Sequence, residues 1–243
     1  MTVHVFGTMG TVVSLRSSDG ALSGDDLEAV EAVFRSYDQM FSLYDDDSAL
    51  SRIRQGELTL AGAETSVRDA YSVAIDWRNR TAGAFTPHRP DGVIDLSGVV
   101  KALAMADAAL RLDDRADAWL LNVGGDVLAR GSHEGSPWSV GVVDPSLRDR
   151  LAGLVELTGT RCAVATSGTA ERGQHIWRRG SEAFTQVTVI ADDIVTADVI
   201  ATAIAAGDEE DLDRLTAAHD IDVLTFDATG AARATPGARR WVV

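Results

Sequence analysis

The sequence predicts an α+β fold in which largely antiparallel β-sheets pack against helices. Segments with helical periodicity lie early and late in the chain, and the middle is rich in short apolar strands. Several of these strands are joined by turns too short to hold the helical crossover that a parallel pair needs. We expect residues 1–243 to form a single domain, with two interwoven subdomains as the alternative.

The first elements are two strands followed by helices. The strand pair is broken at Gly7–Gly10, and Ser23 to Asp26 fits a capping box at the start of the first helix. The helices carry apolar side chains spaced three and four residues apart. The expected elements are strands within 2–16, helices over 25–44 and 65–80, and a helix that starts after Ser97 and runs to Leu112.

The middle of the chain alternates short apolar runs with clusters of Gly, Pro, Asp and Ser, which is typical of strands and turns. Strands are expected over 118–123, 126–130, 138–143, 151–157, 161–165 and 185–191. Two helices over 196–206 and 209–218 and a last strand over 221–226 complete the pattern.

Composition limits the function. The 22 basic and 37 acidic side chains give a formal charge of −15, so a broad electrostatic surface for nucleic acid or an anionic membrane is excluded. The single cysteine, Cys162, excludes a disulfide framework and a multi-cysteine metal site. The N-terminus lacks the features of a signal peptide and no run is apolar enough to span a membrane, so we expect a cytoplasmic protein.

Several common catalytic motifs are absent. The chain has no G-x-G-x-x-G after a strand, no H-E-x-x-H and no G-x-S-x-G. Its only lysine, Lys101, is followed by alanine, so it does not belong to a P-loop. Any phosphate chemistry must therefore use another arrangement of residues.

Asp198 and Thr202 lie four residues apart in an alanine-rich helix, so their oxygens project from one face. A carboxylate and a hydroxyl one turn apart form part of a site for a hard cation such as Mg²⁺. The alternative is an aspartate in the first turn that interacts with the helix dipole, and a threonine bonded to its own helix.

Asp95 and Lys101 flank the start of another helix, whose free N–H groups favour an anion. The lysine has the wrong charge for that end of the helix dipole, so reaching an anion or pairing with Asp95 is favoured. An ordinary Asp–Lys surface pair is the alternative.

Two further segments are ambiguous. Gly124-Gly125 fits a two-residue hairpin turn, or a place where a planar ligand approaches the backbone. The run Thr166-Ser167-Gly168 fits a plain turn, or a set of hydroxyl and amide donors for phosphate. His175 follows it closely and is a candidate general base, because an unperturbed histidine titrates near pH ~6.5.

Taken in order, these motifs resemble the ApbE family of FAD:protein FMN transferases. The resemblance extends over nearly the whole chain and is carried by Phe6-Gly-Thr-Met-Gly-Thr11, Tyr44, Ser48-Ala-Leu-Ser-Arg-Ile53, Gly83-Ala-Phe85, Ile94-Asp-Leu-Ser-Gly-Val-Val-Lys101, Asn122-Val-Gly-Gly-Asp126, Trp138 to Pro145, Ala165-Thr-Ser-Gly168, His175-Ile176, Val187-Thr-Val-Ile190 and Ala197-Asp-Val-Ile-Ala-Thr202.

The resemblance implies an ApbE-like, T-fold-like structure and an enzyme that uses Mg²⁺ to cleave FAD. FMN is transferred to a Thr or Ser hydroxyl of an acceptor flavoprotein through a phosphoester bond, and AMP leaves. By position, Asp198, Thr202 and the carbonyl of Gly98 match metal ligands, and His175 matches the catalytic base. The positions that match flavin-nucleotide contacts are Met9, Tyr44, Phe85, Thr86, Asp95, Lys101 and Ile176.

The sequence departs from the family pattern at Thr86, at Ala102 and Ala106 after the lysine, and in the run that begins at His175. Thr86 stands where the family usually has aspartate, and the usual His-Ile-x-Asp-Pro run is His175-Ile-Trp-Arg-Arg-Gly180. Two other functions therefore stay open: an FAD pyrophosphatase that uses water as acceptor, and a weakly active FAD-binding protein.

Overall fold

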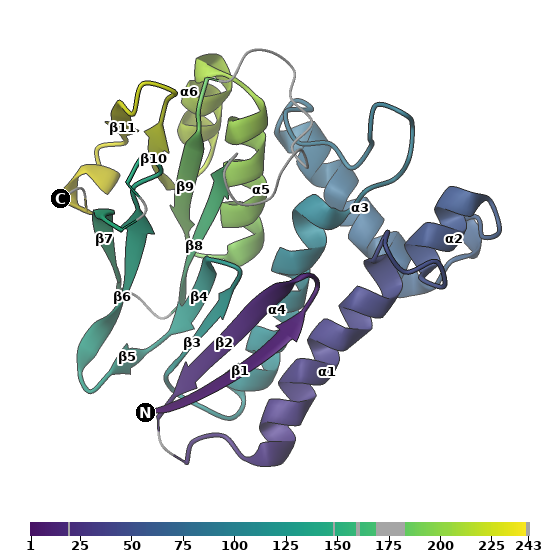
Figure 1. Cartoon of the computed structure of the whole chain (residues 1–243), viewed down its shortest axis with the longest axis horizontal. Helices are drawn as coiled ribbons and strands as arrows, with labels where there is room; N and C mark the ends of the chain where they lie inside the picture. Colours follow the sequence, from purple (N-terminus) through teal and green to yellow (C-terminus); the bar gives the residue numbers. More distant parts are fainter. Residues whose placement is uncertain (19, 148, 159–160, 169–182, 242–243) are drawn as a thin grey trace.

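A large antiparallel sheet with helices on one face forms most of the computed structural model (Figure 1). The structure describes residues 1–18, 20–147, 149–158, 161–168 and 183–241. The strands of this sheet lie in the order β1-β2-β3-β4-β8-β9-β10-β11. Their bounds are β1 Thr2–Thr8, β2 Thr11–Ser17, β3 Trp119–Val123, β4 Asp126–Arg130, β8 Arg161–Gly168, β9 Gln186–Ala191, β10 Asp222–Phe226 and β11 Ala232–Ala234.

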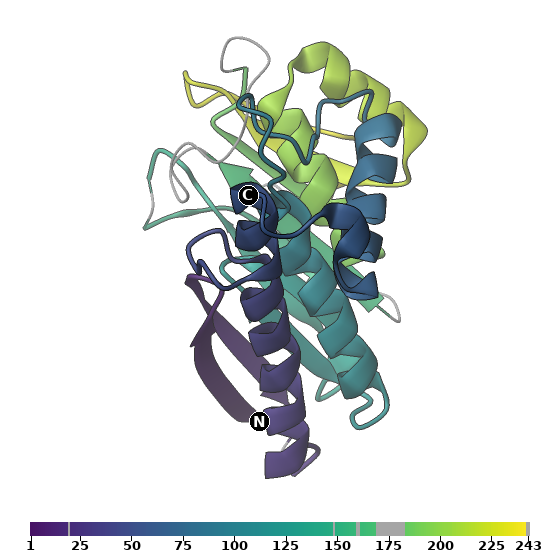
Figure 2. The same ribbon diagram turned by 90° about the vertical axis from the view of Figure 1, so that its right-hand side faces the viewer.

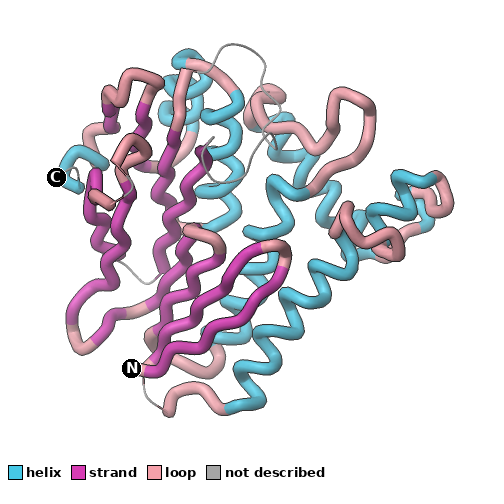
Figure 3. Tube along the Cα trace, viewed as in Figure 1, coloured by secondary structure: helices cyan, strands magenta, loops and turns pink. Residues whose placement is uncertain are grey.

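The helices gather on one side of this sheet, as the turned view in Figure 2 shows. They are α1 Gly24–Phe41, α2 Ala49–Gln55, α3 Thr65–Arg80, α4 Ser97–Asp113, α5 Ile194–Ala206 and α6 Glu209–Ala218, with a short 3₁₀ helix at Leu60–Gly62. A second 3₁₀ helix, Ala238–Trp241, instead contacts β7 Leu151–Leu157 and β10. Helix α2 lies at the far end of α1, away from the sheet (Figure 3).

A smaller antiparallel sheet of β5 Ser132–His133, β6 Ser136–Val143 and β7 Leu151–Leu157 is separate from the large one. Its buried residues, including Trp138 and Val155, form one cluster with residues of β4, β8, β9 and β10. A second, larger cluster joins the other face of these strands to the helices. Alternate residues of β8 accordingly serve different cores: Ala163 and Ala165 face the helices and Val164 faces the small sheet.

Helix α5 occupies the centre of the helical layer. It packs against α4, α6, β8 and β9, and nearly every position from Ala197 to Ala206 is buried. A helix that is apolar all round is suited to such a place, and its alanines allow neighbouring elements to approach closely. Because α5 carries Asp198, this packing brings a carboxylate into the interior of the protein.

The expected fold class and most expected elements are confirmed, including the capping box in which Ser23 and Asp26 bond to each other's backbone N–H groups. Every pairing between named strands in the described residues is antiparallel. In that same part of the chain, none of the helices combines the length and the hydrophobicity that crossing a bilayer requires.

The first helix was expected to reach residue 44 but ends at Phe41. The carbonyl of Ser42 accepts hydroxyl hydrogen bonds from Ser48 and Ser51 at 2.6 and 3.2 Å. The backbone of Ser42 is extended (ψ 121°), so these bonds stabilise a change of direction instead of another turn. Tyr44, whose spacing favoured the longer helix, is 89% exposed.

Candidate active site

Lys101 lies at the centre of a buried cluster of charges. Its ammonium contacts Asp126 Oδ2 directly and lies 3.6 Å from Asp198 Oδ1. The three residues are 5%, 1% and 5% exposed, and they come from α4, β4 and α5. The lysine is therefore buried and not part of a surface pair. Asp95, its other expected partner, accepts the N–H of Ser97 through Oδ1 at 2.9 Å.

Local sequence explains how Asp126 arrives in this cluster. Gly124 and Gly125 have φ angles of 58° and 96° and form the two-residue turn between β3 and β4. This left-handed geometry is the one that glycine adopts without strain, so the hairpin interpretation is confirmed. Asp126 is the first residue after the turn, and its Oδ1 accepts the N–H of Thr166 at 3.0 Å.

Thr166 and Ser167 lie within the last part of β8, so the interpretation of this segment as a plain turn is wrong. They pair with Thr188 and Val187 of β9, and the hydroxyls of Thr166 and Thr188 are 2.9 Å apart. Ser167 Oγ lies 3.2 Å from Thr202 Oγ1 of α5. The polar end of β8 thus joins the two aspartates and Thr202 in one region of the fold.

Asp198 is not at the helix terminus. Asp193 caps α5 by accepting the N–H of Thr196 at 2.8 Å, which places Asp198 in the second turn. The interpretation of Asp198 as a first-turn residue that interacts with the helix dipole is therefore wrong. Thr202, one turn further on, has Ser167 as a hydroxyl partner across the interface with β8.

The cluster has an unsatisfied acceptor. Asp198 Oδ2 is buried and has no hydrogen-bond partner among the described residues. Within the described part of the chain, the one lysine and two aspartates of this cluster carry a formal net charge of −1, and an uncompensated buried charge is costly. Both observations fit a site for a divalent cation with oxygen ligands, such as Mg²⁺.

Such a cation would depend on few side chains. In the described ranges, no group of three or more His, Cys, Asp and Glu side chains is placed to hold a metal ion. The oxygens available are those of Asp198 and Thr202, together with backbone oxygens and water. This is a set that fits Mg²⁺, which usually retains several water ligands.

Gly98 lies in the first turn of α4, against the ring of Phe85. A Cβ at position 98 would lie 3.0 Å from Phe85 Cε2, so glycine allows this close packing. Phe85 is itself 3% exposed, and its backbone N–H donates to Thr81 Oγ1 at 3.1 Å. In the structure Phe85 therefore supports the start of α4, and its expected contact with a nucleotide stays a prediction.

Thr86 and Asp95 begin and end the loop that leads into α4. Thr86 Oγ1 accepts the N–H of His88 at 3.3 Å, and the N–H of Asp95 donates to the carbonyl of Pro87 at 2.8 Å. These bonds hold the loop closed on itself. Both side chains are half-buried.

Met9 lies at the tip of the β1–β2 hairpin. It has a positive φ of 48°, and its N–H donates to Asp38 Oδ2 of α1 at 3.1 Å. This bond ties the hairpin tip to the helix. The expected nucleotide contact of Met9 stays a prediction.

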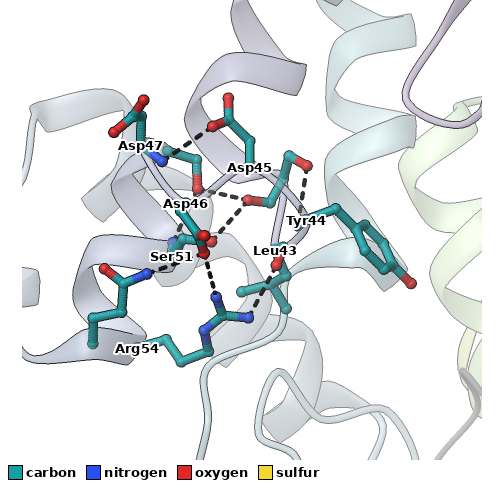
Figure 4. A network of polar contacts seen from close by, with 10 residues as sticks. Leu43, Tyr44, Asp45, Asp46, Asp47, Ser51 and Arg54 are labelled. Atoms are coloured by element: carbon teal, nitrogen blue, oxygen red, sulfur yellow. Dashed lines mark hydrogen bonds and ion pairs between the residues drawn. The ribbon is translucent and has the colours of Figure 1, made fainter.

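A polar network holds the loop that carries Tyr44 (Figure 4). Arg54 of α2 donates to the carbonyl of Leu43 at 2.9 Å and to Asp46 Oδ1 at 3.2 Å. The hydroxyls of Ser48 and Ser51 bond to the carbonyl of Ser42, as described above. Both carbonyls that precede Tyr44 are thus fixed to the α2 region, although the ring itself is exposed and extends away from the network.

His175 and Ile176, the expected base and one expected nucleotide contact, lie outside the described residues. Two residues that the sequence did not single out are Asp126 and Arg54. Asp126 belongs to a motif that was noted for its glycines, and its burial beside a lysine was not visible in the sequence. Arg54 follows a noted motif directly, but many exposed arginines have no such role.

Comparisons with known proteins bear on this arrangement. The family model described as the ApbE family matches residues 88–225, which include Lys101, Asp126, Asp198 and Thr202. A curated protein of Rhodobacter capsulatus, named FAD:protein FMN transferase, is 33% identical over 161 residues. This match covers 60% of the chain and 30% of the R. capsulatus protein, so it spans less than a third of that relative.

Solved structures share the fold. The flavin transferase ApbE of Vibrio cholerae has a TM-score of 0.79 at 21% identity, and 99% of each chain is covered. The ApbE protein of Thermotoga maritima has a TM-score of 0.81 at 18% identity, covering 100% of this chain and 99% of that one. The flavinyl transferase ApbE of Pseudomonas stutzeri, in its apo form, has a TM-score of 0.79 at 22% identity, with 99% and 97% covered.

Proposed function

Because the chain belongs to the ApbE family, whose model matches more than half of it, we propose that it is an FAD:protein FMN transferase. The reaction is transfer of FMN from FAD to a Thr or Ser hydroxyl of an acceptor protein, with release of AMP. The name of the R. capsulatus relative supports FAD as donor and a protein as acceptor. The observation that carries the proposal is the buried Lys101–Asp126–Asp198 cluster with its unsatisfied carboxylate oxygen.

Asp198 and Thr202, with the carbonyl of Gly98, are the proposed ligands of Mg²⁺. A cation bound there would offset the negative charge of the FAD pyrophosphate. Lys101 adds a second positive group from α4, and the N–H groups at the start of that helix favour an anion as well. Met9, Tyr44, Phe85, Thr86, Asp95 and Ile176 are the proposed contacts of the flavin nucleotide.

The transfer forms one phosphoester bond, breaks one bond of the pyrophosphate and releases one proton. The acceptor hydroxyl oxygen bonds to the phosphorus on the FMN side, and the bond between that phosphorus and the bridging oxygen breaks, so AMP leaves. His175 is the proposed base that takes the hydroxyl proton. A hydroxyl is weakly acidic, so a positioned base increases the rate.

The proposal is tested by incubating purified protein with FAD, Mg²⁺ and a candidate acceptor. The expected products are AMP and an acceptor that carries flavin fluorescence in a denaturing gel. Neither product should form when EDTA is added. Free FMN with an unlabelled acceptor would contradict transfer and indicate a pyrophosphatase. Bound FAD at one per chain with no AMP over hours would indicate a binding protein.

We predict that His175→Ala leaves the dissociation constant for FAD within about twofold and slows transfer about 10²- to 10⁴-fold, the usual contribution of a general base. Binding is measured by fluorescence titration and transfer by flavin fluorescence on the acceptor. Loss of FAD binding would instead make His175 a nucleotide contact or a structural residue.

We predict that Arg54→Met raises KM for FAD about 3- to 10-fold with kcat unchanged, because Tyr44 loses a backbone restraint worth ~1 kcal/mol. Arg54→Lys should restore part of the loss. The control is Arg52→Met, which removes an exposed pair with Glu57 at 3.9 Å. In a Tyr44→Ala background, Arg54→Met should have no further effect on KM; an additive effect would show that Arg54 does not act through Tyr44.

A further inference from the structure

We propose that Asp126 is a positioning residue that holds the Lys101 ammonium away from Asp198, so that Asp198 keeps a carboxylate oxygen available for a divalent cation. This inference rests on the proposed function in taking Asp198 as a ligand of the cation. It assigns a role to Asp126, which takes no part in the proposed reaction.

The first support is the unequal sharing of the ammonium. Lys101 Nζ is in direct contact with Asp126 Oδ2, whereas Asp198 Oδ1 is 3.6 Å away and Asp198 Oδ2 has no partner in the described chain. Electrostatic attraction grows as distance falls, so of the two carboxylates Asp126 attracts the ammonium more strongly. The carboxylate of Asp198 is therefore less occupied by the lysine, and its Oδ2 is left for another cation.

The second support is that Asp126 is fixed in place. Its Oδ1 accepts the N–H of Thr166, and its backbone begins β4 directly after the Gly124-Gly125 turn. Only 1% of the residue is exposed, so the carboxylate has little freedom to move. A fixed carboxylate can hold a long, flexible lysine side chain in one position.

The third support concerns the position of the Lys101 ammonium when Asp126 is replaced by a neutral residue. Of the two carboxylates in this cluster, only that of Asp198, at 3.6 Å, would then still attract the buried ammonium. The lysine side chain is flexible enough to close this distance. An ammonium paired with Asp198 would repel a divalent cation and occupy its ligand.

Asp126→Asn tests this role, because asparagine has nearly the same shape and can still accept the Thr166 N–H. Binding of Mn²⁺ alone, without FAD, is measured by titration calorimetry and electron paramagnetic resonance. We expect affinity for Mn²⁺ to fall about 10- to 100-fold, the range seen when a residue that orients a metal ligand is lost. The matched control is Asp113→Asn, whose carboxylate pairs with Arg130 at 3.2 Å, and it should leave affinity unchanged.

The decisive variant is Lys101→Met/Asp126→Asn. If Asp126 acts by restraining the lysine, removing the lysine should return Mn²⁺ affinity to within about threefold of the original protein. A purely structural role for Asp126, such as holding β8 through Thr166, predicts weak binding in both variants and would overturn the inference. The double variant gives this answer even when Asp126→Asn alone does not fold.

Asp198→Asn separates this inference from the proposed function. If the original protein binds Mn²⁺ and Asp198→Asn does not, the proposed metal site holds, and unchanged affinity in Asp126→Asn then contradicts the inference alone. Equal Mn²⁺ binding by the original protein and Asp198→Asn would contradict the metal site itself, and with it the inference.

Discussion

Replacing Asp198 with asparagine is expected to reduce Mg²⁺-dependent AMP release from FAD by about 10²- to 10³-fold while raising the melting temperature of the metal-free protein. The loss of activity follows from removal of the proposed charged ligand, and the magnitude is that of one group which stabilises developing charge. The rise in stability follows from the buried cluster, because the formal charge of its three described side chains (Lys101, Asp126 and residue 198) would change from −1 to 0.

The two effects are measured separately. AMP release is followed with and without EDTA, and unfolding is followed by calorimetry in EDTA. A gain of about 1 kcal/mol in unfolding free energy corresponds to ~2–4 °C in a chain of this size. The control is Asp213→Asn, an exposed aspartate on α6, which should change neither quantity. Unchanged AMP release in Asp198→Asn would overturn the metal assignment.

Replacing Lys101 with methionine is expected to lower the free energy of unfolding by about 3–5 kcal/mol, the usual cost of removing one partner of a buried ion pair. Methionine fills a similar volume, so the cost arises mainly from charge. Asp126 and Asp198, at 1% and 5% exposure, would be left together in the interior without their cation. The melting temperature should fall by roughly 6–20 °C.

The control for this prediction is Arg52→Met, because Arg52 forms an exposed pair with Glu57 and exposed pairs contribute ~0–1 kcal/mol. Lys101→Met/Asp126→Asn should be more stable than Lys101→Met alone, since it removes one of the two unpaired carboxylates. A Lys101→Met protein as stable as the Arg52→Met control would show that the lysine charge is not needed in the folded interior.

Most of the fold could be predicted because its signals are local. The regular spacing of apolar residues predicted α3 with its observed bounds, and the glycines Gly124-Gly125 predicted a hairpin turn. Helix α2 and strand β11 were missed because they have seven and three residues, too few to show a period. The end of α1 was misplaced because it depends on hydroxyl groups of Ser48 and Ser51, beyond the helix.

The candidate site was predicted less completely, because its geometry is not local. The spacing of Asp198 and Thr202 predicted a metal site, but it was equally consistent with an aspartate in the first turn of a helix. The structure excludes the second interpretation, because α5 begins at Ile194. The partner of Lys101 is 25 residues away on another element. The residues around Asp126 in the sequence do not indicate its contact with Lys101, because the contact forms only when β4 packs against α4.

The burial of Lys101 has a consequence for covalent labelling. It is the only lysine in the sequence, so its ε-amino group is the only side-chain amine of residues 1–243 that an acylating dye can modify. Lys101 is only 5% exposed. The folded protein should therefore leave this lysine unmodified, and dye found on Lys101 by peptide mapping would report directly on opening of the cluster between α4 and α5.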